Sequence, residues 1–532
     1  MPEATGAEQR TLNVTSAIFD PWDTPDAEQQ PAIHYRGTVW SYRRLISEIN
    51  RAGNALKALG VRREERILLI AYDSPHFVAL MYGAMKIGAV PIPVNPYLPL
   101  DDYAYFLEDS RAKLLAVEPE IWHDLAPRLA GRAPDVSLVM ILPGLSTAQL
   151  APSGHPGPFV FYEDFVPRMA PELEAAATSP DEAAFWLYSS GSTGKPKGAV
   201  HCHKDMIFCN DTYGREVLAI ARDDVLFSAS KLYFAYGLGN GSYFAFANGA
   251  SVVLLPEKVE PVLVLDTIER TSPTLFFGVP TLYNAMLRVQ TREYSFPSLR
   301  ACVSAGEPLP AEIFLRWQER YGVEIVDGIG STEVLHIYIS NRLGSCRPGA
   351  SGLVVPGYEV KIVDEGGVPV PQGEIGDLYV KGGSVAAFYW NQTAKTQSAM
   401  VGEWYRTGDK YYMDPDGYYC YAGRSDDMMK VGGMWVSPSE VENALLRHDA
   451  VAEAAVVAVP DAAGLDKPVA HVILNVGHVP SKELEDSLRS FARDQLAHFK
   501  VPRAFYFVDE LPKTATGKIQ RYKLRTGLAA QR

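Results

Sequence analysis

The chain has 532 residues, 47% of them hydrophobic and 21% charged, and its formal net charge is −13. This composition is typical of a globular protein longer than one ordinary core, so two or more domains are expected. The acidic balance and the absence of a long basic run disfavour nucleic-acid binding. Five scattered cysteines without a Cys-x-x-Cys pair indicate a reducing compartment and no disulfide framework.

The compartment and the relation to membranes are also predicted from the sequence. The N-terminal residues lack an apolar signal core. The longest apolar region, about residues 226–255, is interrupted by Lys231 and several glycines, so it does not resemble a membrane span. We therefore expect a cytoplasmic protein without a membrane partner.

In chain order, the apolar pattern predicts alternating helices and strands. Residues 41–56 have apolar spacing near 3.6 and predict a helix. Residues 66–71 and 250–255 are short continuous apolar runs, as expected for buried parallel strands. Residues 353–388 are rich in Val, Gly and Pro and predict antiparallel strands or a small barrel. The fold class is therefore α/β with parallel sheets in a large N-terminal domain.

The composition changes after Gly423 to a compact unit of about a hundred residues. Residues 437–446 predict a helix capped by serine with an early proline, and residues 451–459 predict a strand. A small α+β C-terminal domain is expected.

Residues 188–198 read Tyr-Ser-Ser-Gly-Ser-Thr-Gly-Lys-Pro-Lys-Gly and lie between two apolar runs. Their glycines allow the backbone to approach a ligand, and turns of this kind present N–H groups to anions. The spacing differs from a Walker A loop, because two residues separate Gly191 and Gly194 and proline follows Lys195. We expect a loop that binds a nucleotide triphosphate rather than a flexible linker.

Four further segments follow in order: Asp327-Gly-Ile-Gly-Ser-Thr-Glu333, Trp404-Tyr-Arg-Thr-Gly-Asp409, residues 423–433 and Pro512-Lys-Thr-Ala-Thr-Gly-Lys518. A glutamate that ends a Gly/Ser/Thr turn can hold Mg²⁺. Each segment alone is a weak signal, but the five in this order resemble the acyl-adenylate-forming (ANL) superfamily over nearly the whole chain. The resemblance implies an N-terminal domain of residues 1–425, a mobile C-terminal domain of residues 426–532 and a hinge at Asp426.

The resemblance also implies the reaction and the nucleotide site. A carboxylate attacks the α-phosphate of ATP to give an acyl-adenylate, and a thiol such as that of coenzyme A then displaces AMP. Lys518, Glu333 and Thr193 are the implied catalytic residues, Glu333 holds Mg²⁺, and Asp409 and Arg424 take the ribose hydroxyls. The implied ATP-binding residues are Ser189, Ser190, Gly191, Ser192, Thr193, Gly194, Lys195, Lys197, Ala305, Gly306, Glu307, Pro308, Asp327, Gly328, Ile329, Gly330, Ser331, Thr332, Asp409 and Arg424.

For the second step, the resemblance implies that the C-terminal domain rotates and that a loop lines a pantetheine tunnel. The implied coenzyme A residues are Lys430, Gly432, Gly433 and Trp435. The same resemblance is compatible with a homodimer and with a lysine acetyltransferase that acts on Lys518.

The acid site is expected around two segments, one containing Phe234 and Tyr236 and the other containing His336. These segments resemble those of benzoate–CoA ligases more than those of fatty-acyl, acetyl or 4-coumarate ligases. Phe234 and Tyr236 offer flat faces for stacking on a ring. His336 is expected to bind a 4-hydroxyl group or to cap a pocket sized for benzoate. The implied substrate-binding residues are Phe234, Ala235, Tyr236, Gly330, His336 and Ile337.

Several alternatives remain open. The substrate could be 4-hydroxybenzoate, or the activated acid could be loaded onto a carrier-protein phosphopantetheine. A non-catalytic relative would lack Glu333 or Lys518, and both are present. We interpret His201-Cys-His203 as a turn and helix start rather than a zinc site, and residues 237–241 as a loop rather than a dinucleotide fingerprint. The expected function is an AMP-forming acid–thiol ligase of aromatic acid degradation.

Overall fold

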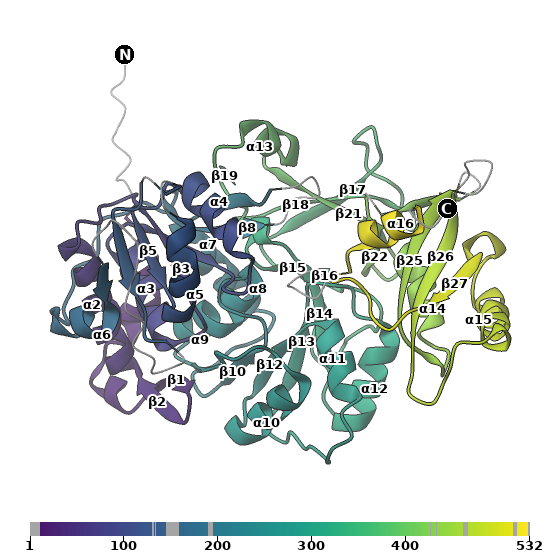
Figure 1. The fold of residues 1–532 in the computed structure, drawn as a ribbon, viewed down its shortest axis with the longest axis horizontal. Coiled ribbons are helices and arrows are strands. Elements are labelled where there is room, and N and C mark those ends of the chain that lie inside the picture. The colour runs from purple at the N-terminus through teal and green to yellow at the C-terminus, as the bar shows by residue number, and fades with distance from the viewer. Residues whose placement is uncertain are drawn as a thin grey trace.

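The computed structural model describes residues 11–129, 132–133, 135–144, 159–189, 195–425, 427–431, 434–460, 466–513 and 519–529. Within these residues a large N-terminal part carries a smaller C-terminal domain at one end (Figure 1). The described residues contain no helix long and apolar enough to cross a bilayer.

The largest sheet runs in the order β16-β15-β14-β13-β12-β10-β11-β1-β2. Its central strands, from β14 to β1, are parallel, and antiparallel strands lie at both edges. Its strands are β1 (Pro31–Tyr35), β2 (Thr38–Ser41), β10 (Val225–Ser228), β11 (Ser251–Leu254), β12 (Leu275–Gly278), β13 (Ala301–Ser304), β14 (Ile325–Gly330), β15 (Ile337–Ser340) and β16 (Leu353–Val354).

A second, parallel sheet has the order β4-β3-β5-β6-β7. Its central strands are continuous apolar runs because both of their faces are covered. Its strands are β3 (Arg66–Ile70), β4 (Val90–Val94), β5 (Leu114–Val117), β6 (Leu138–Ile141) and β7 (Phe159–Phe161). The parallel strands expected from residues 66–71 and 250–255 are therefore confirmed.

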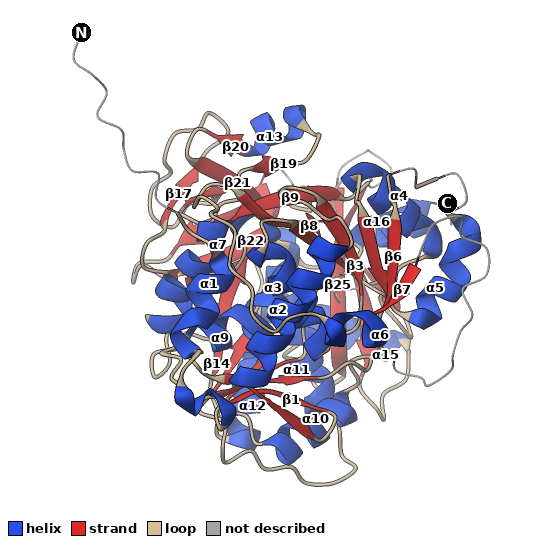
Figure 2. Cartoon of the chain, turned by 90° about the vertical axis from the view of Figure 1, so that its left-hand side faces the viewer, coloured by secondary structure: helices blue, strands red, loops and turns tan. Residues whose placement is uncertain are grey.

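Two helices lie between these sheets (Figure 2): α2 (Tyr42–Ala58), which is buried along one face, and α3 (Pro75–Lys86), which is buried over nearly its whole surface. Ser41 caps α2 by accepting a hydrogen bond from the Arg44 N–H at 3.3 Å, which confirms the helix expected there. The helices touch at glycines, because a Cβ on Gly83 would lie 2.7 Å from the Gly53 nitrogen. The other N-terminal α-helices are α1 (Val14–Phe19), α4 (Leu100–Ser110), α5 (Pro119–Leu125), α6 (Tyr162–Phe165), α7 (His203–Cys209), α8 (Ala235–Leu238), α9 (Phe244–Ala247), α10 (Pro261–Thr271), α11 (Pro280–Leu287), α12 (Ala311–Tyr321) and α13 (Thr393–Ala399).

Short helical turns complete the N-terminal part and one connection of the C-terminal domain. Two of them, η5 (Asn210–Arg215) and η6 (Gly239–Tyr243), are π-helical. The 3₁₀ turns are η1 (Asp20–Trp22), η2 (Pro25–Glu28), η3 (Ala126–Arg128), η4 (Val166–Arg168), η7 (Thr332–Val334) and η8 (His498–Lys500).

Antiparallel strands form the rest of the N-terminal part, as expected for residues 353–388. One small sheet joins β8 (Ala183–Ser189), β9 (Lys197–Cys202) and β19 (Phe388–Tyr389). Another contains β17 (Glu359–Val363), β18 (Gly376–Lys381), β20 (Met400–Val401), β21 (Trp404–Met413) and β22 (Tyr419–Arg424).

The C-terminal domain packs helices against the sheet β25-β26-β27. Ser437 accepts a hydrogen bond from the Glu440 N–H at 3.2 Å, so the expected capped helix is confirmed. A separate core contains Val436, Val441, Leu445, Val456, Val472 and Leu488. The elements are β23 (Met429–Val431), β24 (Met434–Val436), α14 (Pro438–Leu445), β25 (Val451–Pro460), β26 (Asp466–Leu474), α15 (Lys482–Gln495), β27 (Ala504–Phe507) and α16 (Arg521–Ala529).

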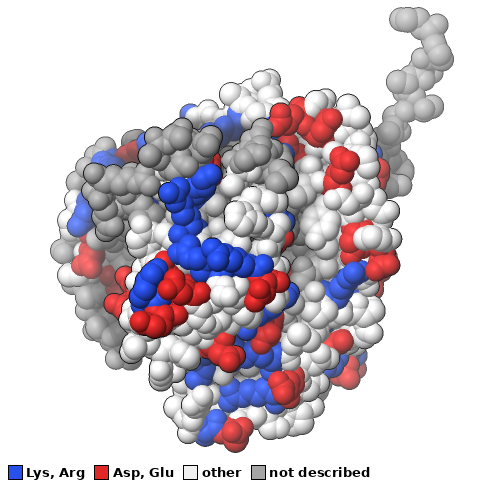
Figure 3. All heavy atoms as spheres, turned by 90° about the vertical axis from the view of Figure 1, so that its right-hand side faces the viewer, with Lys and Arg blue, Asp and Glu red and all other residues white. Residues whose placement is uncertain are grey.

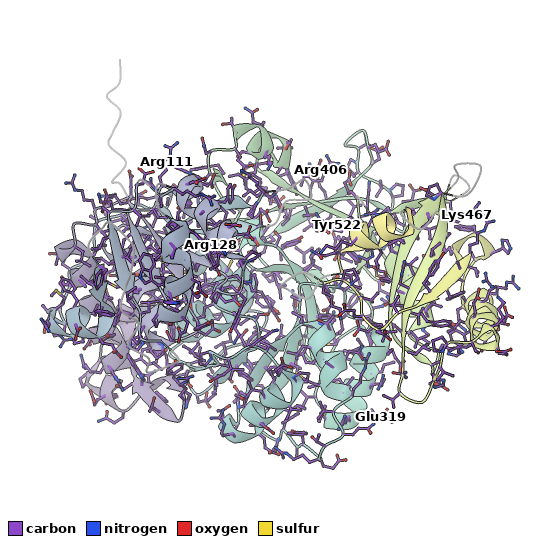
Figure 4. All side chains as sticks on the ribbon, in the orientation of Figure 1. Arg111, Arg128, Glu319, Arg406, Lys467 and Tyr522 are labelled. Atoms are coloured by element: carbon purple, nitrogen blue, oxygen red, sulfur yellow. The ribbon has the colours of Figure 1, made fainter. Side chains whose placement is uncertain are left out.

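Contacts between the two parts include the end of α11 with the start of β25, and β22 with α14. The side chains of Asn284 and Arg288 donate to the Ala452 carbonyl at 3.2 and 2.6 Å. On the face of the C-terminal domain in Figure 3, basic side chains lie beside acidic ones, and ion pairs of this domain include Lys500–Glu440 at 2.6 Å. Arg406 on β21 and Tyr522 on α16 lie on the side where the two parts meet (Figure 4).

Two local expectations were wrong. Residues 237–241 are helical, in α8 and η6, and glycine occurs there because neighbouring backbone and the His336 ring leave no room for a side chain at Gly237 or Gly239. His201 lies on β9, which continues to Cys202, and helix α7 starts at His203; the expected helix start is confirmed, but no turn separates the strand from the helix. No group of three or more potential ligand side chains gathers to hold a metal in the described part of the chain.

Candidate active site

The segment expected to bind phosphate connects the paired strands β8 and β9. β8 and β9 pair antiparallel, and Ser189 stands opposite Lys197 in the last pair before the segment that connects the two strands. Two tyrosines fix the hairpin: Tyr188 donates to Asp109 at 2.7 Å and Tyr105 donates to the Pro196 carbonyl at 2.7 Å. The residues at the tip, Ser190, Gly191, Ser192, Thr193 and Gly194, lie outside the described residues.

Glu333 is the meeting point of the hairpin and the turn η7. Its Oε1 accepts hydrogen bonds from the Ser189 hydroxyl at 2.9 Å and from the Tyr389 hydroxyl at 2.9 Å, and it lies 3.1 Å from the Lys197 ammonium. Lys197 also donates to the Tyr389 hydroxyl at 2.6 Å. Burial alone would favour the neutral acid, but Lys197 and these donors lower the pKa of Glu333 below its ordinary value. The carboxylate is therefore ionised at neutral pH.

Tyr389 has no signal in the sequence that marks it as a site residue, since it lies 56 positions from Glu333. Its segment is held against η7 by the Ala386 N–H, which donates to the Glu333 carbonyl at 2.8 Å. The Ser384 hydroxyl donates to the Val334 carbonyl at 2.8 Å. These bonds place the Tyr389 ring beside Lys197, whose ammonium lies 3.9 Å from the ring centroid.

The adjacent strand ends carry buried polar groups without partners. Ser304 and Asp327 stand opposite each other on β13 and β14. Within the described residues Asp327 Oδ1 and the Ser331 hydroxyl make no hydrogen bond. Burial raises the pKa of Asp327 to about 8. Buried polar groups normally find partners, so these atoms indicate a polar ligand at this edge of the sheet.

Asp409 and Arg424 stand opposite each other on β21 and β22. The Arg424 guanidinium lies 2.9 Å from Asp409 Oδ1, and the Asp409 N–H donates to the Thr407 hydroxyl at 3.1 Å. The structure thus brings together the two residues expected to bind a ribose.

Aromatic rings surround His336 on the other side of the η7 segment. Its ring centroid lies 5.5 Å from Tyr236, 5.2 Å from Tyr213 and 4.5 Å from Phe244. His336 Nε2 lies 3.1 Å from the Asn240 side-chain oxygen. Burial lowers the pKa of His336 to about 3, so the imidazole is neutral. We call Tyr213, Tyr236, Phe244 and His336 the aromatic wall.

Tyr213, Asn240 and Phe244 were missed in the sequence because nothing local distinguishes them from ordinary core residues. Phe234 makes an edge contact with Tyr233 at 4.7 Å instead of joining the aromatic wall. Ala235 and Ile337 are buried. Gly330 is required by the close approach of the chain, since a Cβ there would lie 2.6 Å from the His336 carbonyl.

The residues expected to act from the C-terminal domain are only partly described. Lys518, Asp426, Gly432 and Gly433 lie outside the described residues. The backbones of Lys430 and Trp435 pair in the β23–β24 hairpin, and their side chains are not described.

Comparison with known proteins identifies the family. The AMP-binding enzyme family matches residues 23–390, and its C-terminal domain family matches residues 440–518. The chain belongs to the AMP-binding enzymes of the ANL superfamily. Benzoate–CoA ligase from Thauera aromatica is 46% identical over 92% of this chain and 90% of that protein. A 4-hydroxybenzoate–CoA/benzoate–CoA ligase from Rhodopseudomonas palustris is 43% identical over 91% of this chain and 88% of that protein.

Solved structures of this enzyme family share the fold. A benzoate CoA ligase from Burkholderia xenovorans matches with a TM-score of 0.87 and 41% identity, covering 97% of this chain and 100% of that one. An anthranilate CoA ligase in complex with anthranoyl-AMP matches with a TM-score of 0.92 and 40% identity, covering 98% of both chains. The expected α/β class with a separate C-terminal domain is confirmed.

Proposed function

We propose that this enzyme converts benzoate or a closely related aryl carboxylate into its acyl-adenylate with ATP and then into its acyl-CoA, with release of pyrophosphate and AMP. The observation that carries the proposal is the continuity of the two sites. Glu333 in the turn η7 belongs to the ATP site, and His336, three residues later in the chain, belongs to the aromatic wall. An aromatic acid beside this wall would therefore lie next to the nucleotide.

The adenylation step needs hydrogen-bond donors and cations set in advance around the phosphates. Ser189 and Lys197 stand at the two ends of the phosphate loop and contact the same Glu333 oxygen, which fixes them before the ligand arrives. Asp409 and Arg424 would hold the ribose, and the unpartnered oxygen of Asp327 would accept a hydrogen bond from the nucleotide.

Glu333 also fits a magnesium ion. Mg²⁺ commonly takes one or two carboxylates together with substrate phosphates; Glu333 is an ionised carboxylate, and no group of three or more ligand residues gathers within the described residues. When bound, Mg²⁺ would supply charge neutralisation to the phosphates.

The C-terminal domain would complete the two steps. Lys518 would stabilise the charge of adenylation, and the loop with Lys430, Gly432, Gly433 and Trp435 would then line the path of coenzyme A. We place the domain boundary between residues 425 and 426, with Asp426 as the hinge. A cytoplasmic location, a homodimer and acetylation of Lys518 by a lysine acetyltransferase are compatible with this scheme.

Benzoate and 4-hydroxybenzoate, which differ in one substituent on the ring, are the two alternative substrates. His336 Nδ1 has no hydrogen-bond partner among the described residues, so a 4-hydroxyl group could donate to it. We rank benzoate first because the remaining members of the aromatic wall supply ring faces.

A panel of benzoate, 4-hydroxybenzoate, anthranilate and hexanoate, each with ATP and coenzyme A, tests the proposal through AMP release and mass detection of the thioester. Losing the ring contacts should cost the alkanoate about 1–3 kcal/mol for each missing group, so benzoate is expected to have the higher kcat/KM. A higher value for hexanoate would contradict the proposal. Adenylation without acyl-CoA formation would favour a carrier protein as acceptor.

A further inference from the structure

His201 is a buried histidine in the N-terminal part that the proposed reaction does not use. It lies on β9, four residues after Lys197, and its side chain is 0% exposed. Its Nε2 lies 2.8 Å from the Thr332 carbonyl oxygen, and its Nδ1 lies 2.8 Å from Asp205 Oδ2. The ring lies nearly parallel to Phe185, with centroids 5.2 Å apart.

The chemistry of these partners determines where the hydrogens lie. A carbonyl oxygen only accepts, so Nε2 must carry a hydrogen and donate it to Thr332. Asp205 Oδ2 also accepts the Cys202 N–H at 3.0 Å, which holds the carboxylate in place. A second proton lies between His201 Nδ1 and Asp205 Oδ2. Whether this proton is bonded to the nitrogen or to the oxygen, the His201–Asp205 pair has no net charge. Asp205 therefore keeps the imidazole in the form that donates from Nε2.

The bond connects the two halves of the nucleotide site. β9 leaves the phosphate-binding segment through Lys197, and Thr332 immediately precedes Glu333 in the turn η7. Lys197 reaches the Glu333 side chain, whereas His201 reaches the backbone one residue earlier. The His201 bond thus fixes the main chain from which the Glu333 carboxylate projects.

We propose that His201, oriented by Asp205, is a positioning residue for adenylation that holds the η7 turn and its Glu333 carboxylate in register with the phosphate-binding hairpin. This inference rests on the proposed function. It predicts that the hydrogen bond to Thr332, and not the mere presence of a buried polar side chain, is needed for ATP and Mg²⁺ to bind.

His203 provides a matched control two residues away. It is equally buried, its Nδ1 accepts the Val14 N–H at 3.1 Å, and its Nε2 has no partner within the described residues. Burial lowers the pKa of His203 to about 4, so this ring is neutral and serves packing. His203→Asn should change stability without changing the affinity for ATP.

Two substitutions of His201 separate its two bonds. The amide of His201→Asn can take the place of Nδ1 and keep the contact with Asp205, but it is too short to reach Thr332. The longer amide of His201→Gln can take the place of Nε2 and donate to Thr332. We would measure ATP–Mg²⁺ affinity by calorimetry without an acid, the rate of benzoyl-AMP formation, the rate of thioester formation from supplied benzoyl-AMP, and Tm.

His201→Asn should weaken ATP–Mg²⁺ binding and adenylation by about 10–100-fold, as for residues that orient a metal ligand, and leave thioester formation within about twofold. His201→Gln should retain most of both activities. Adenylation by His201→Asn at the parental rate per folded molecule, or an equal loss in both variants, would overturn the proposal.

Asp205→Asn keeps the test decisive if His201→Asn does not fold. The amide oxygen would accept from Cys202 and from Nδ1–H, so Nε2 would present a lone pair to the Thr332 carbonyl. The same loss of ATP–Mg²⁺ affinity is expected, and parental affinity would contradict the proposal. If the parental enzyme adenylates none of the aryl acids, the proposed function fails, but the calorimetric comparison still decides the role of His201.

Discussion

The hydroxyl of Tyr389 on strand β19 donates to the carboxylate of Glu333 in the turn η7 at 2.9 Å. The same hydroxyl accepts a hydrogen bond from Lys197 at 2.6 Å. A single side chain therefore orients both the acidic and the basic group of the nucleotide site.

Tyr389→Phe removes this shared hydroxyl. Adenylation should fall by about 10–100-fold, because Glu333 and Lys197 lose their common partner, while thioester formation from supplied benzoyl-AMP is retained. The control is Tyr411→Phe, which removes another buried hydroxyl, bonded to Ser351 at 2.9 Å. Equal effects of both substitutions on adenylation would show that Tyr389 acts only through stability.

Glu333→Gln should change the pH dependence of stability. The folded protein holds the pKa of Glu333 below its ordinary value of 4.5, so the ionised group stabilises the fold above that pH. This contribution is lost as the pH falls through the folded pKa. Urea unfolding should show a stability gap between parent and variant at about pH 7 that narrows at about pH 4. A gap that widens on acidification would contradict the assignment of an ionised Glu333.

Gly239→Ala should damage the aromatic wall. Its Cβ would lie 2.6 Å from the His336 ring and 2.9 Å from the Tyr243 hydroxyl. We expect a loss of about 1–3 kcal/mol in unfolding free energy and a higher KM for the aryl acid, with little change in KM for ATP. Gly241→Ala is the milder control, since its Cβ would meet the end of the flexible Leu232 side chain at 3.1 Å. A larger effect at Gly241 would contradict this packing argument.

Lys518→Ala should abolish adenylation and spare the second step. Removing a group that stabilises charge only in the first transition state typically costs factors of about 10²–10³. The two half-reactions are measured separately, with benzoyl-AMP supplied for the second. Equal loss of both steps would indicate that Lys518 is needed for folding or for both reactions.

Asp426→Pro should give the opposite pattern. Proline fixes φ near −65°, which restricts rotation at the proposed hinge. Benzoyl-AMP formation should persist, and most thioester formation should be lost. Thioester formation at the parental rate would rule out either the rotation or this hinge position.

Much of the fold could be predicted because its signals are local. Continuous apolar runs predicted the parallel strands β3 and β11, and a capping serine with proline predicted α14. The helical turn η6 was missed because its signal is not local. Its glycines suggest a loop, but the His336 ring packs against Gly239 and leaves no room there for a side chain. Glycine in a helix interior is unfavourable by itself, so only a distant contact explains it.

The sequence by itself determined the family resemblance, the order of the nucleotide-site segments and the candidate residues Lys197, Glu333 and Asp409, because these lie in short stretches with characteristic residue types. Only the tertiary structure decided which side chains hold them. Tyr389 and His201 reach the η7 turn from positions 56 and 131 residues away. Contacts across such distances depend on how strands pair in space, which no local pattern of residues records.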